Sequence, residues 1–280
     1  MTACNPKEQL YIASDYVYVG SFTQGLEGPA TDNEGTLFFV NPIRSGTIGQ
    51  VNRLGKFSLF IEQLPEGSIA NGIRFGDDGT MYLADYTGHN ILSVDVATQV
   101  VKIVAFDSLL NQPNDLAICC NNRLYASDPD WKNGTGNLWK IENGTFERIA
   151  ENMGTTNGIA ISPDEKTLYV NESVQRNVWA FDLDIIGRIS NKRLLISFEE
   201  FGLDGMRCDA KGNLYITRYG KGTVVKVSPK GEVLEEIQLK GKKPSNIAFG
   251  GDDGRTVFVT LQDRGYIETF RVSDAGKNFQ

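Results

Sequence analysis

Six polar residues recur at matching places along the chain, and their side chains suit the binding of a hard cation. Each precedes a short apolar segment by ten to twelve residues. The set supplies two carboxylates and three amide oxygens, with neither histidine nor cysteine. Ca²⁺ takes about six to eight such oxygens, whereas Zn²⁺ and Cu²⁺ favour imidazole or thiolate. The six residues are Glu27, Asn71, Asn114, Asn157, Asp204 and Ser245.

The apolar segments that follow these residues form an internal repeat. Their first residues lie 43 to 46 positions apart, by subtraction of residue numbers, and an aromatic residue follows each one directly. This period is typical of a four-stranded propeller blade and is too long for most helical repeats. The six segments begin at Leu37, Met81, Leu124, Leu168, Leu214 and Val257.

Within each repeat, alternation of apolar and polar residues predicts four strands joined by tight turns. The third repeat shows this most clearly, with strands expected at residues 116–118, 124–127, 137–141 and 146–149. No segment carries an apolar stripe of helical period over three turns. We therefore predict an all-β fold, a six-bladed β-propeller with four-stranded antiparallel blades, as a single domain over residues 1–280.

The last repeat is one strand short at the C-terminus, because only residues 266–272 read as a strand after the segment that begins at Val257. A ring left open would expose two strand edges. The alternating stretch at residues 16–20 precedes the first blade and is free to pair there. We predict that this N-terminal strand closes the last blade.

In such a propeller the first strand of each blade lines the central channel, so equivalent side chains converge on one axis. Asparagine or aspartate before a strand is often only a turn former, but Glu27 is a poor one. The convergence predicts one divalent cation in the channel. Ca²⁺ is the first choice, with Mg²⁺, Mn²⁺ and Zn²⁺ as alternatives, because cavity size and rigidity decide between such ions.

Five short motifs occur in order at blade spacing, and with them the chain resembles the gluconolactonase/regucalcin family over nearly its whole length. Diisopropyl-fluorophosphatase and paraoxonase are more distant relatives. The motifs are Glu27-Gly28-Pro29, Pro113-Asn114-Asp115, Asn157-Gly158-Ile159-Ala160, Asp204-Gly205-Met206 and Pro244-Ser245-Asn246.

The resemblance implies a catalytic divalent metal in the channel and hydrolysis of lactones, or of organophosphates in some members. Carried over by position, it implies that Glu27, Asn157 and Asp204 are metal ligands and that Asn114 binds the metal or contacts the substrate. Gln112 stands where sugar-lactone members have an arginine, which weakens the case for an aldonolactone. Ala248 replaces a histidine of the phosphatase relatives.

We therefore expect metal-dependent hydrolysis of a sugar-type or other small lactone, with the metal polarising the carbonyl. Asp204 is the first candidate for the base and Asp128 the second, since some bacterial lactonases use an aspartate at that place. Asp204 acting as a nucleophile is the other route. The alternatives are a phosphotriesterase or arylesterase on the same site, and a non-enzymatic ligand-binding propeller.

The substrate is expected at the channel mouth formed by the loops after the second strands. These loops present Asn41, Asp85, Tyr86, Asp128, Trp131, Glu172, Arg218 and Gln262. The expected substrate contacts are Asn71, Gln112, Asn114, Asp128, Trp131 and Arg218. His89, the only histidine, is expected to be a solvated loop residue.

A formal charge of −7 and a pI near 4.9 argue against nucleic acid or an anionic membrane as partner. The expected partner is a small lactone, and the oligomeric state stays open. The sequence shows neither a long apolar run nor an apolar signal region after Met1. We expect a cytoplasmic protein, or a secreted or periplasmic one if residues 2–4 begin a trimmed mature form.

Overall fold

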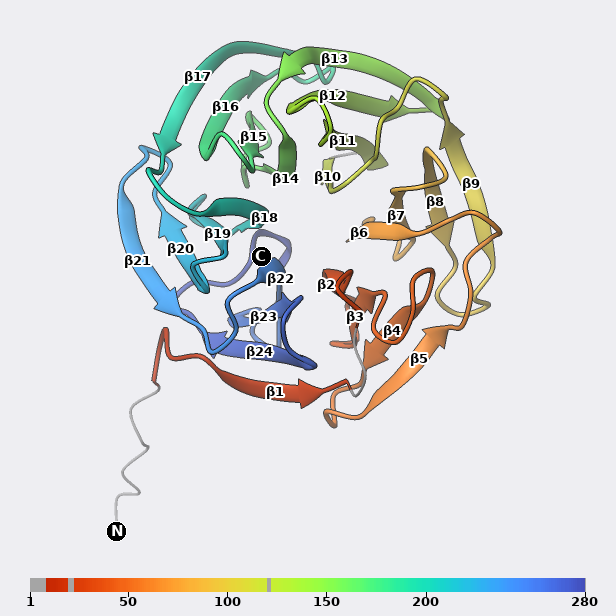
Figure 1. Cartoon of the computed structure of the whole chain (residues 1–280), viewed down its shortest axis with the longest axis vertical. Coiled ribbons are helices and arrows are strands. Elements are labelled where there is room, and N and C mark those ends of the chain that lie inside the picture. The colour runs from red at the N-terminus through yellow and green to blue at the C-terminus, as the bar shows by residue number, and fades with distance from the viewer. Residues whose placement is uncertain (1–8, 20–22, 120–121, 280) are drawn as a thin grey trace.

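The computed structural model describes residues 9–19, 23–119 and 122–279. In these residues 24 strands form six four-stranded antiparallel sheets, which are arranged as blades around a central channel (Figure 1). The described residues contain no α-helix, and therefore none that could cross a membrane. The predicted six-bladed β-propeller is confirmed.

Each blade is a meander that runs from the channel outward. The blades are β2 (Glu27–Thr31), β3 (Leu37–Val40), β4 (Ile48–Val51) and β5 (Phe57–Ile61); β6 (Ala70–Phe75), β7 (Met81–Asp85), β8 (Asn90–Val94) and β9 (Val101–Phe106); β10 (Leu116–Cys119), β11 (Arg123–Asp130), β12 (Thr135–Glu142) and β13 (Thr145–Met153); β14 (Thr156–Ile161), β15 (Thr167–Glu172), β16 (Asn177–Leu183) and β17 (Ile189–Ser197); β18 (Gly202–Cys208), β19 (Leu214–Tyr219), β20 (Thr223–Val227) and β21 (Val233–Gln238); and β22 (Pro244–Gly250), β23 (Thr256–Leu261), β24 (Tyr266–Arg271) and β1 (Ser14–Tyr18).

The N-terminal strand closes the ring, as predicted. β1 pairs antiparallel with β24, with Ser14 opposite Thr269 and Tyr18 opposite Tyr266. The amide of Val19 extends the pairing by donating to the Gly265 carbonyl at 2.8 Å. The strand begins two residues earlier than the predicted stretch, and Gly20 lies outside the described residues.

The hydrophobic core is divided into six clusters, one between each pair of adjacent blades. Successive residues of a strand point to opposite faces of its sheet. Both faces of a blade are covered by neighbours, so all four residues of β3 are buried. The repeated aromatic position contributes fully buried rings such as Tyr125 and Tyr215. This packing fixes each blade relative to the next.

The inner strands are irregular at the places that face the channel. In five blades the pairing of the first two strands shifts register there, as between Glu27 and Ala30 or between Thr156 and Ile159. An extra residue in a strand bends it and re-aims a side chain. The shifts therefore account for the direction of the ring residues toward the channel.

A glycine after a ring residue lets neighbouring inner strands approach closely. Gly28 has a φ of 57°, and a Cβ there would lie 2.3 Å from the Asn71 carbonyl oxygen. A Cβ on Gly158 would lie 2.4 Å from the Asp204 carbonyl oxygen. Only glycine fits these contacts, so the ring-residue–glycine pairs hold the channel narrow.

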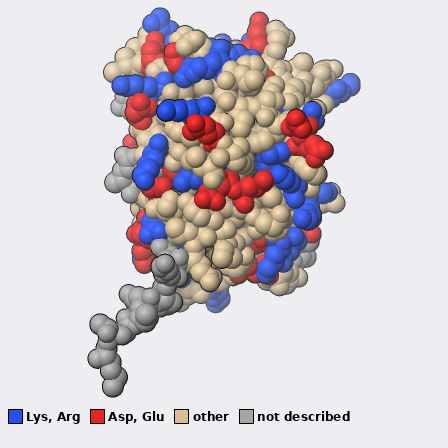
Figure 2. Space-filling view, turned by 90° about the vertical axis from the view of Figure 1, so that its left-hand side faces the viewer, with Lys and Arg blue, Asp and Glu red and all other residues tan. Residues whose placement is uncertain are grey.

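The outer strands carry charges of both signs. β17 and β21, at the left of Figure 1, are largely exposed and include Lys192, Arg193 and Glu235. On the face shown in Figure 2, basic and acidic side chains are interspersed. Charged outer strands discourage pairing with a second sheet edge.

Candidate metal centre in the channel

Two buried carboxyl groups meet in the channel. Glu27 comes from β2 and Asp204 from β18, and their side chains are hydrogen-bonded to each other. They are 2% and 9% exposed. Burial raises the pKa of both groups, and the charge of the other nearby carboxylates, Asp115 for Glu27 and Glu27 for Asp204, raises it further. The pair therefore requires a shared proton or a cation.

Two amide oxygens complete this group. Asn114 and Asn157 are buried, and the Oδ1 atom of each has no hydrogen-bond partner in the described part of the chain. The Asn157 side chain donates to the Asp204 carboxylate, which leaves its own oxygen free. A buried polar atom without a partner costs about 1–3 kcal/mol. The orphaned Asn157 oxygen next to Asp204, together with that of Asn114 at an equivalent place of the repeat, fits a hard divalent cation.

This donor set depends on its amide oxygens. No group of three or more His, Cys, Asp or Glu side chains that could hold a metal exists among the described residues. Two carboxylates balance the charge of a divalent ion, and two neutral oxygens add ligands without adding charge.

The other two ring positions bind protein instead. The Asn71 amide donates to the Asn114 carbonyl at 3.2 Å. Ser245 Oγ lies 2.8 Å from the Leu26 carbonyl, to which it donates, and 2.8 Å from Thr260 Oγ1. Equivalent places in the repeat thus divide into residues with free oxygens and residues that join adjacent blades.

A second charged layer, absent from the sequence predictions, lies next to the ring. Arg74 Nη2 is 2.9 Å and Arg207 Nη1 3.3 Å from the Asp115 carboxylate, which is fully buried. Arg207 Nη1 also donates to Asn246 Oδ1 at 3.0 Å, and the Asn246 side chain is hydrogen-bonded to Glu27. Asn246 therefore connects the two layers.

The two arginines keep Asp115 ionised. Burial alone would raise the pKa of Asp115, but the charges of Arg74 and Arg207 outweigh it and hold that pKa below its usual range. Burial and then the Arg74 charge lower the pKa of Arg207, whose guanidinium still stays protonated at neutral pH. A sequence signal for this layer existed, because Arg74 and Arg207 each follow a ring residue by three positions.

Asp128 lies at the end of the third blade's second strand, fully buried. It accepts hydrogen bonds from the amides of Asn111 and Gln112 at 2.8 and 2.6 Å and from Trp139 Nε1 at 2.9 Å. Acidic residues at the same place in the flanking blades, Asp85 and Glu172, also accept backbone amides of the preceding loop. This shared geometry makes Asp128 a support for the loop that carries Gln112.

The channel mouth gathers several of the predicted substrate contacts. The Tyr86 side chain is hydrogen-bonded to those of Gln112 and Trp131, and Trp131 is 39% exposed. Tyr219 Oη donates to Gln262 Oε1 at 3.2 Å. Burial raises the pKa of Tyr219 and the Asp204 charge adds to this effect, so Tyr219 lies within the field of the carboxyl pair.

Arg218 and His89 make contacts of other kinds. The buried Arg218 guanidinium packs over the Phe198 ring at 3.9 Å and donates to the Glu200 carbonyl, so it secures the loop before β18. No hydrogen bond joins it to the four proposed ligands within the described residues. His89 is half-buried, and its Nδ1 lies 2.6 Å from the Leu110 carbonyl.

Comparison with known proteins supplies independent information. The profile of the SMP-30/Gluconolactonase/LRE-like region matches residues 26–263. Gluconolactonase of Zymomonas mobilis is 28% identical over 289 residues, which cover 90% of this chain and 80% of that protein. 6-Deoxy-6-sulfogluconolactonase of Pseudomonas putida is 33% identical over 115 residues, 40% of each chain.

Solved structures share the fold. Regucalcin of Agrobacterium tumefaciens, described as a calcium-binding protein, superposes with a TM-score of 0.81 at 21% identity, covering 92% of this chain and 94% of that one. A gluconolactonase of Xanthomonas campestris gives 0.80 at 20% identity, with 93% and 89% covered. At such identities the superpositions support the architecture alone.

Proposed function

The chain belongs to the SMP-30/gluconolactonase/LRE-like family, and from that premise we propose that it hydrolyses a small lactone with the help of a divalent cation. The cation would be held by Glu27, Asp204, Asn114 and Asn157. The observation that carries the proposal is the pair of buried carboxyl groups beside two unpartnered amide oxygens. Relatives that are named gluconolactonases support the reaction class.

A cation bound there would supply Lewis-acid polarisation of the lactone carbonyl and would lower the pKa of a water molecule. Ca²⁺ is our first choice because all four protein ligands are oxygens; Mg²⁺, Mn²⁺ and Zn²⁺ are the alternatives.

Asp204 is our candidate for the general base. Its carboxylate accepts a proton as the water oxygen bonds to the carbonyl carbon, and it returns that proton to the ring oxygen as the ester C–O bond breaks. The product is a hydroxy acid. The hydrogen bond from Asn157 fixes the orientation of the Asp204 carboxylate. Direct attack by Asp204 on the carbonyl is the competing route.

Side chains at the channel mouth near the carboxyl pair would orient the substrate. Tyr86, Gln112 and Trp131 form one hydrogen-bonded wall, and Tyr219 lies within the field of Asp204. Polar ring atoms of a lactone can bond with these side chains, while the indole covers an apolar face. Asn71 and Arg218 remain predicted contacts.

The test is hydrolysis of a lactone panel and one phosphotriester, with and without EDTA. We expect turnover of at least one lactone to be lost on chelation and restored by Ca²⁺. Asp204→Asn and Glu27→Gln should each lower kcat by about 10²- to 10⁴-fold. Asp252→Asn, at an aspartate whose side chain is 90% exposed, is the matched control and should leave kcat unchanged.

Asp128→Asn separates its two predicted roles. If Asp128 only supports the loop of Gln112, KM rises while the acidic limb of the kcat profile is unchanged. Loss of that limb would make Asp128 the base. Lactone turnover that is indifferent to EDTA and to both ligand variants would refute the metal-dependent mechanism, and preference for the phosphotriester would favour the alternative activity.

A further inference from the structure

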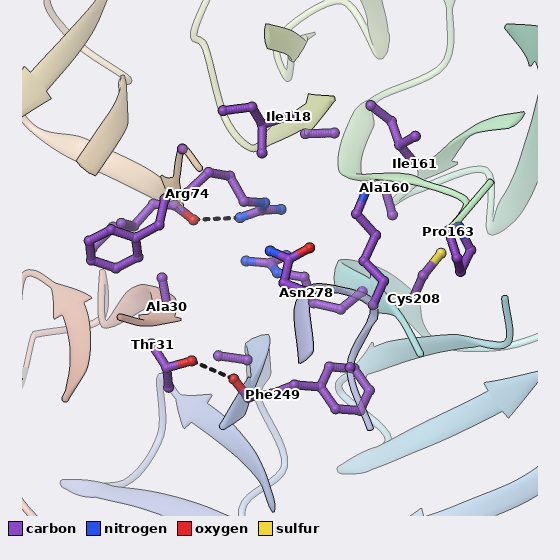
Figure 3. A pocket seen from close by; sticks show the side chains of 18 of the residues that line it. Ala30, Thr31, Arg74, Ile118, Ala160, Ile161, Pro163, Cys208, Phe249 and Asn278 are labelled. Atoms are coloured by element: carbon purple, nitrogen blue, oxygen red, sulfur yellow. Dashed lines mark hydrogen bonds between the residues drawn. The ribbon is translucent and has the colours of Figure 1, made fainter. Parts of the chain in front are cut away.

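A cavity occupies the mouth of the channel opposite to the carboxyl pair. The inner strands begin near the carboxyl pair, and this cavity of about 450 Å³ lies toward their other ends. All six inner strands contribute to its lining, together with the C-terminal segment (Figure 3). It is therefore separate from the proposed metal centre, and the proposed reaction gives it no role.

The inner end of the cavity is cationic. Arg74 and Arg207 line it and share the single carboxylate of Asp115. Their remaining hydrogen bonds go mainly to backbone carbonyls, including Ile73 at 2.7 Å from Arg74 and Met206 at 2.8 Å from Arg207. Neither Nε atom donates a hydrogen bond within the described residues. Two guanidiniums against one carboxylate leave a positive charge with donors to spare.

The C-terminal segment adds a third cation. The Ala210 amide donates to the Ala275 carbonyl at 2.8 Å, and the Gly276 amide donates to Gly254 at 3.0 Å. These bonds fix the segment between two blades and place η2 (Lys277–Phe279) at the cavity. The Lys277 ammonium makes neither a hydrogen bond nor an ion pair with any described residue. Burial lowers its pKa.

Apolar side chains form much of the wall between these cations. Ile118, Ile161 and Phe249 line the sides, as Figure 3 shows. Two acidic residues also line the cavity: Asp77 is exposed, and Glu165 is half-buried. The Glu165 charge acts on Lys277 and opposes the lowering of its pKa by burial. Water screens such charges more than the buried guanidiniums.

We propose that this cavity is a second ligand site, which binds a small organic carboxylate. The carboxylate fits the planar guanidiniums of Arg74 and Arg207, whose N–H groups suit two-oxygen acceptors. Lys277 closes on it from the C-terminal segment. The apolar walls select an acid with a hydrocarbon body over a fully hydrated inorganic anion, and the three cations exclude a metal ion or an amine.

The experiment is calorimetric titration of the full chain, loaded with Ca²⁺, with hexanoate. Hexan-1-ol is the neutral control and inorganic phosphate the inorganic control. We expect saturable binding of hexanoate at one site with Kd on the order of 0.1–1 mM, as for ligands of this size. The alcohol and phosphate should bind at least tenfold more weakly.

Two variants locate the binding. Lys277→Met removes one cation and should weaken hexanoate binding about fivefold or more, whereas Lys230→Met, at an exposed lysine of the β20–β21 turn, should not. Ile118→Trp fills the cavity without changing charge and should abolish binding.

Hexanoate binding that does not saturate, that hexan-1-ol matches, or that survives both Lys277→Met and Ile118→Trp would overturn the proposal. If phosphate binds as tightly as hexanoate or more tightly, the ligand of the cavity is an inorganic anion and the proposal of an organic acid is wrong. Lactone turnover, measured in parallel, should be the same in Lys277→Met and the wild type. Calorimetry measures hexanoate binding directly and does not depend on lactone turnover. The result of this test is therefore independent of the lactonase proposal.

Discussion

The ring residues occupy equivalent positions of the repeat, but their side-chain oxygens differ in whether they have a hydrogen-bond partner. Asn114 and Asn157 keep side-chain oxygens that have no hydrogen-bond partner among the described residues, whereas the Ser245 hydroxyl bonds with Leu26 and Thr260. The four proposed ligands come from four blades, and the remaining positions tie neighbouring strands together. Among the equivalent positions of the repeat, some are thus proposed to bind the cation and others hold adjacent blades together.

The proposed ligands should destabilise the protein when no cation is present. Glu27→Gln removes one of two buried, adjoining carboxyl groups while keeping the side chain's shape, so both the burial cost and the repulsion fall. In EDTA we expect the free energy of unfolding of the variant to exceed that of the wild type by about 1–2 kcal/mol. This corresponds to a rise in Tm of about 2–6 °C.

Calcium should reverse this order, because a ligand that binds only the folded state stabilises it in proportion to its affinity. Scanning calorimetry of both proteins in EDTA and in excess Ca²⁺ gives the comparison, with Asp252→Asn as control. A variant that melts lower than the wild type in EDTA would show that Glu27 is an ordinary structural carboxylate.

Ring residues could be predicted from the sequence because they recur at blade spacing. Asp115 and Asn246 stand one position after ring residues, and Arg74 and Arg207 three positions after, but in strands that read as ordinary apolar segments. Their partners are set by closure of the ring: Arg207 meets Asp115, 92 positions away. No local pattern carries that information.

At the scale of elements, the closing strand is joined to the ring by charge as well as by its backbone. Asp15 of β1 lies 2.9 Å from Arg264 and 2.9 Å from Lys240. The Arg264 hydrogen bond is the main cause that holds the pKa of Asp15 below its usual value. The two cations belong to the turn before β24 and to the loop before β22.

Asp15→Asn should therefore weaken the closure in a pH-dependent way. A folded-state pKa below the unfolded one stabilises the fold above about pH 4, and this stabilisation is lost as pH falls through the folded value. We expect a loss of about 0.5–1 kcal/mol at pH 7 in low salt, since exposed pairs are screened.

Urea unfolding of the wild type and the variant at pH 7 and pH 3 tests this. The difference between them should shrink at pH 3 and in 1 M NaCl. A difference that is the same at both pH values would mean that the ion pairs contribute nothing and that the backbone pairing of β1 alone closes the ring.

Strands were the most predictable elements, since alternation and the repeated aromatic position marked the second strand of every blade to within about three residues. The register shifts of the inner strands were not predictable. They arise where glycines such as Gly28 and Gly158 meet the backbone of the next blade, and that contact exists only in the closed ring.

In the whole molecule, charges alternate along the channel. The carboxyl pair of Glu27 and Asp204 is followed by Asp115 with its two arginines, and then by the cavity that Lys277 adjoins. Asn246 bridges Glu27 and Arg207. The two mouths therefore share one electrostatic field inside a rigid ring, where low polarisability makes charges act over longer distances than in water.

This shared field couples the two proposed sites. A carboxylate on Arg74 and Arg207 offsets part of the positive potential that opposes a cation at Glu27 and Asp204. We expect saturating hexanoate to tighten Ca²⁺ binding by about fivefold, roughly 1 kcal/mol, at the low end of couplings between sites.

Linkage requires the reverse effect to be equal: Ca²⁺ must tighten hexanoate by the same factor. Titrations of each ligand in the presence and absence of the other measure both factors. Lys277→Met should reduce the coupling by weakening hexanoate, while 0.5 M NaCl should diminish it only slightly, because buried charges are poorly screened. Independent binding of the two ligands, with unchanged affinities, would mean that the arginines and Asp115 insulate one mouth of the channel from the other.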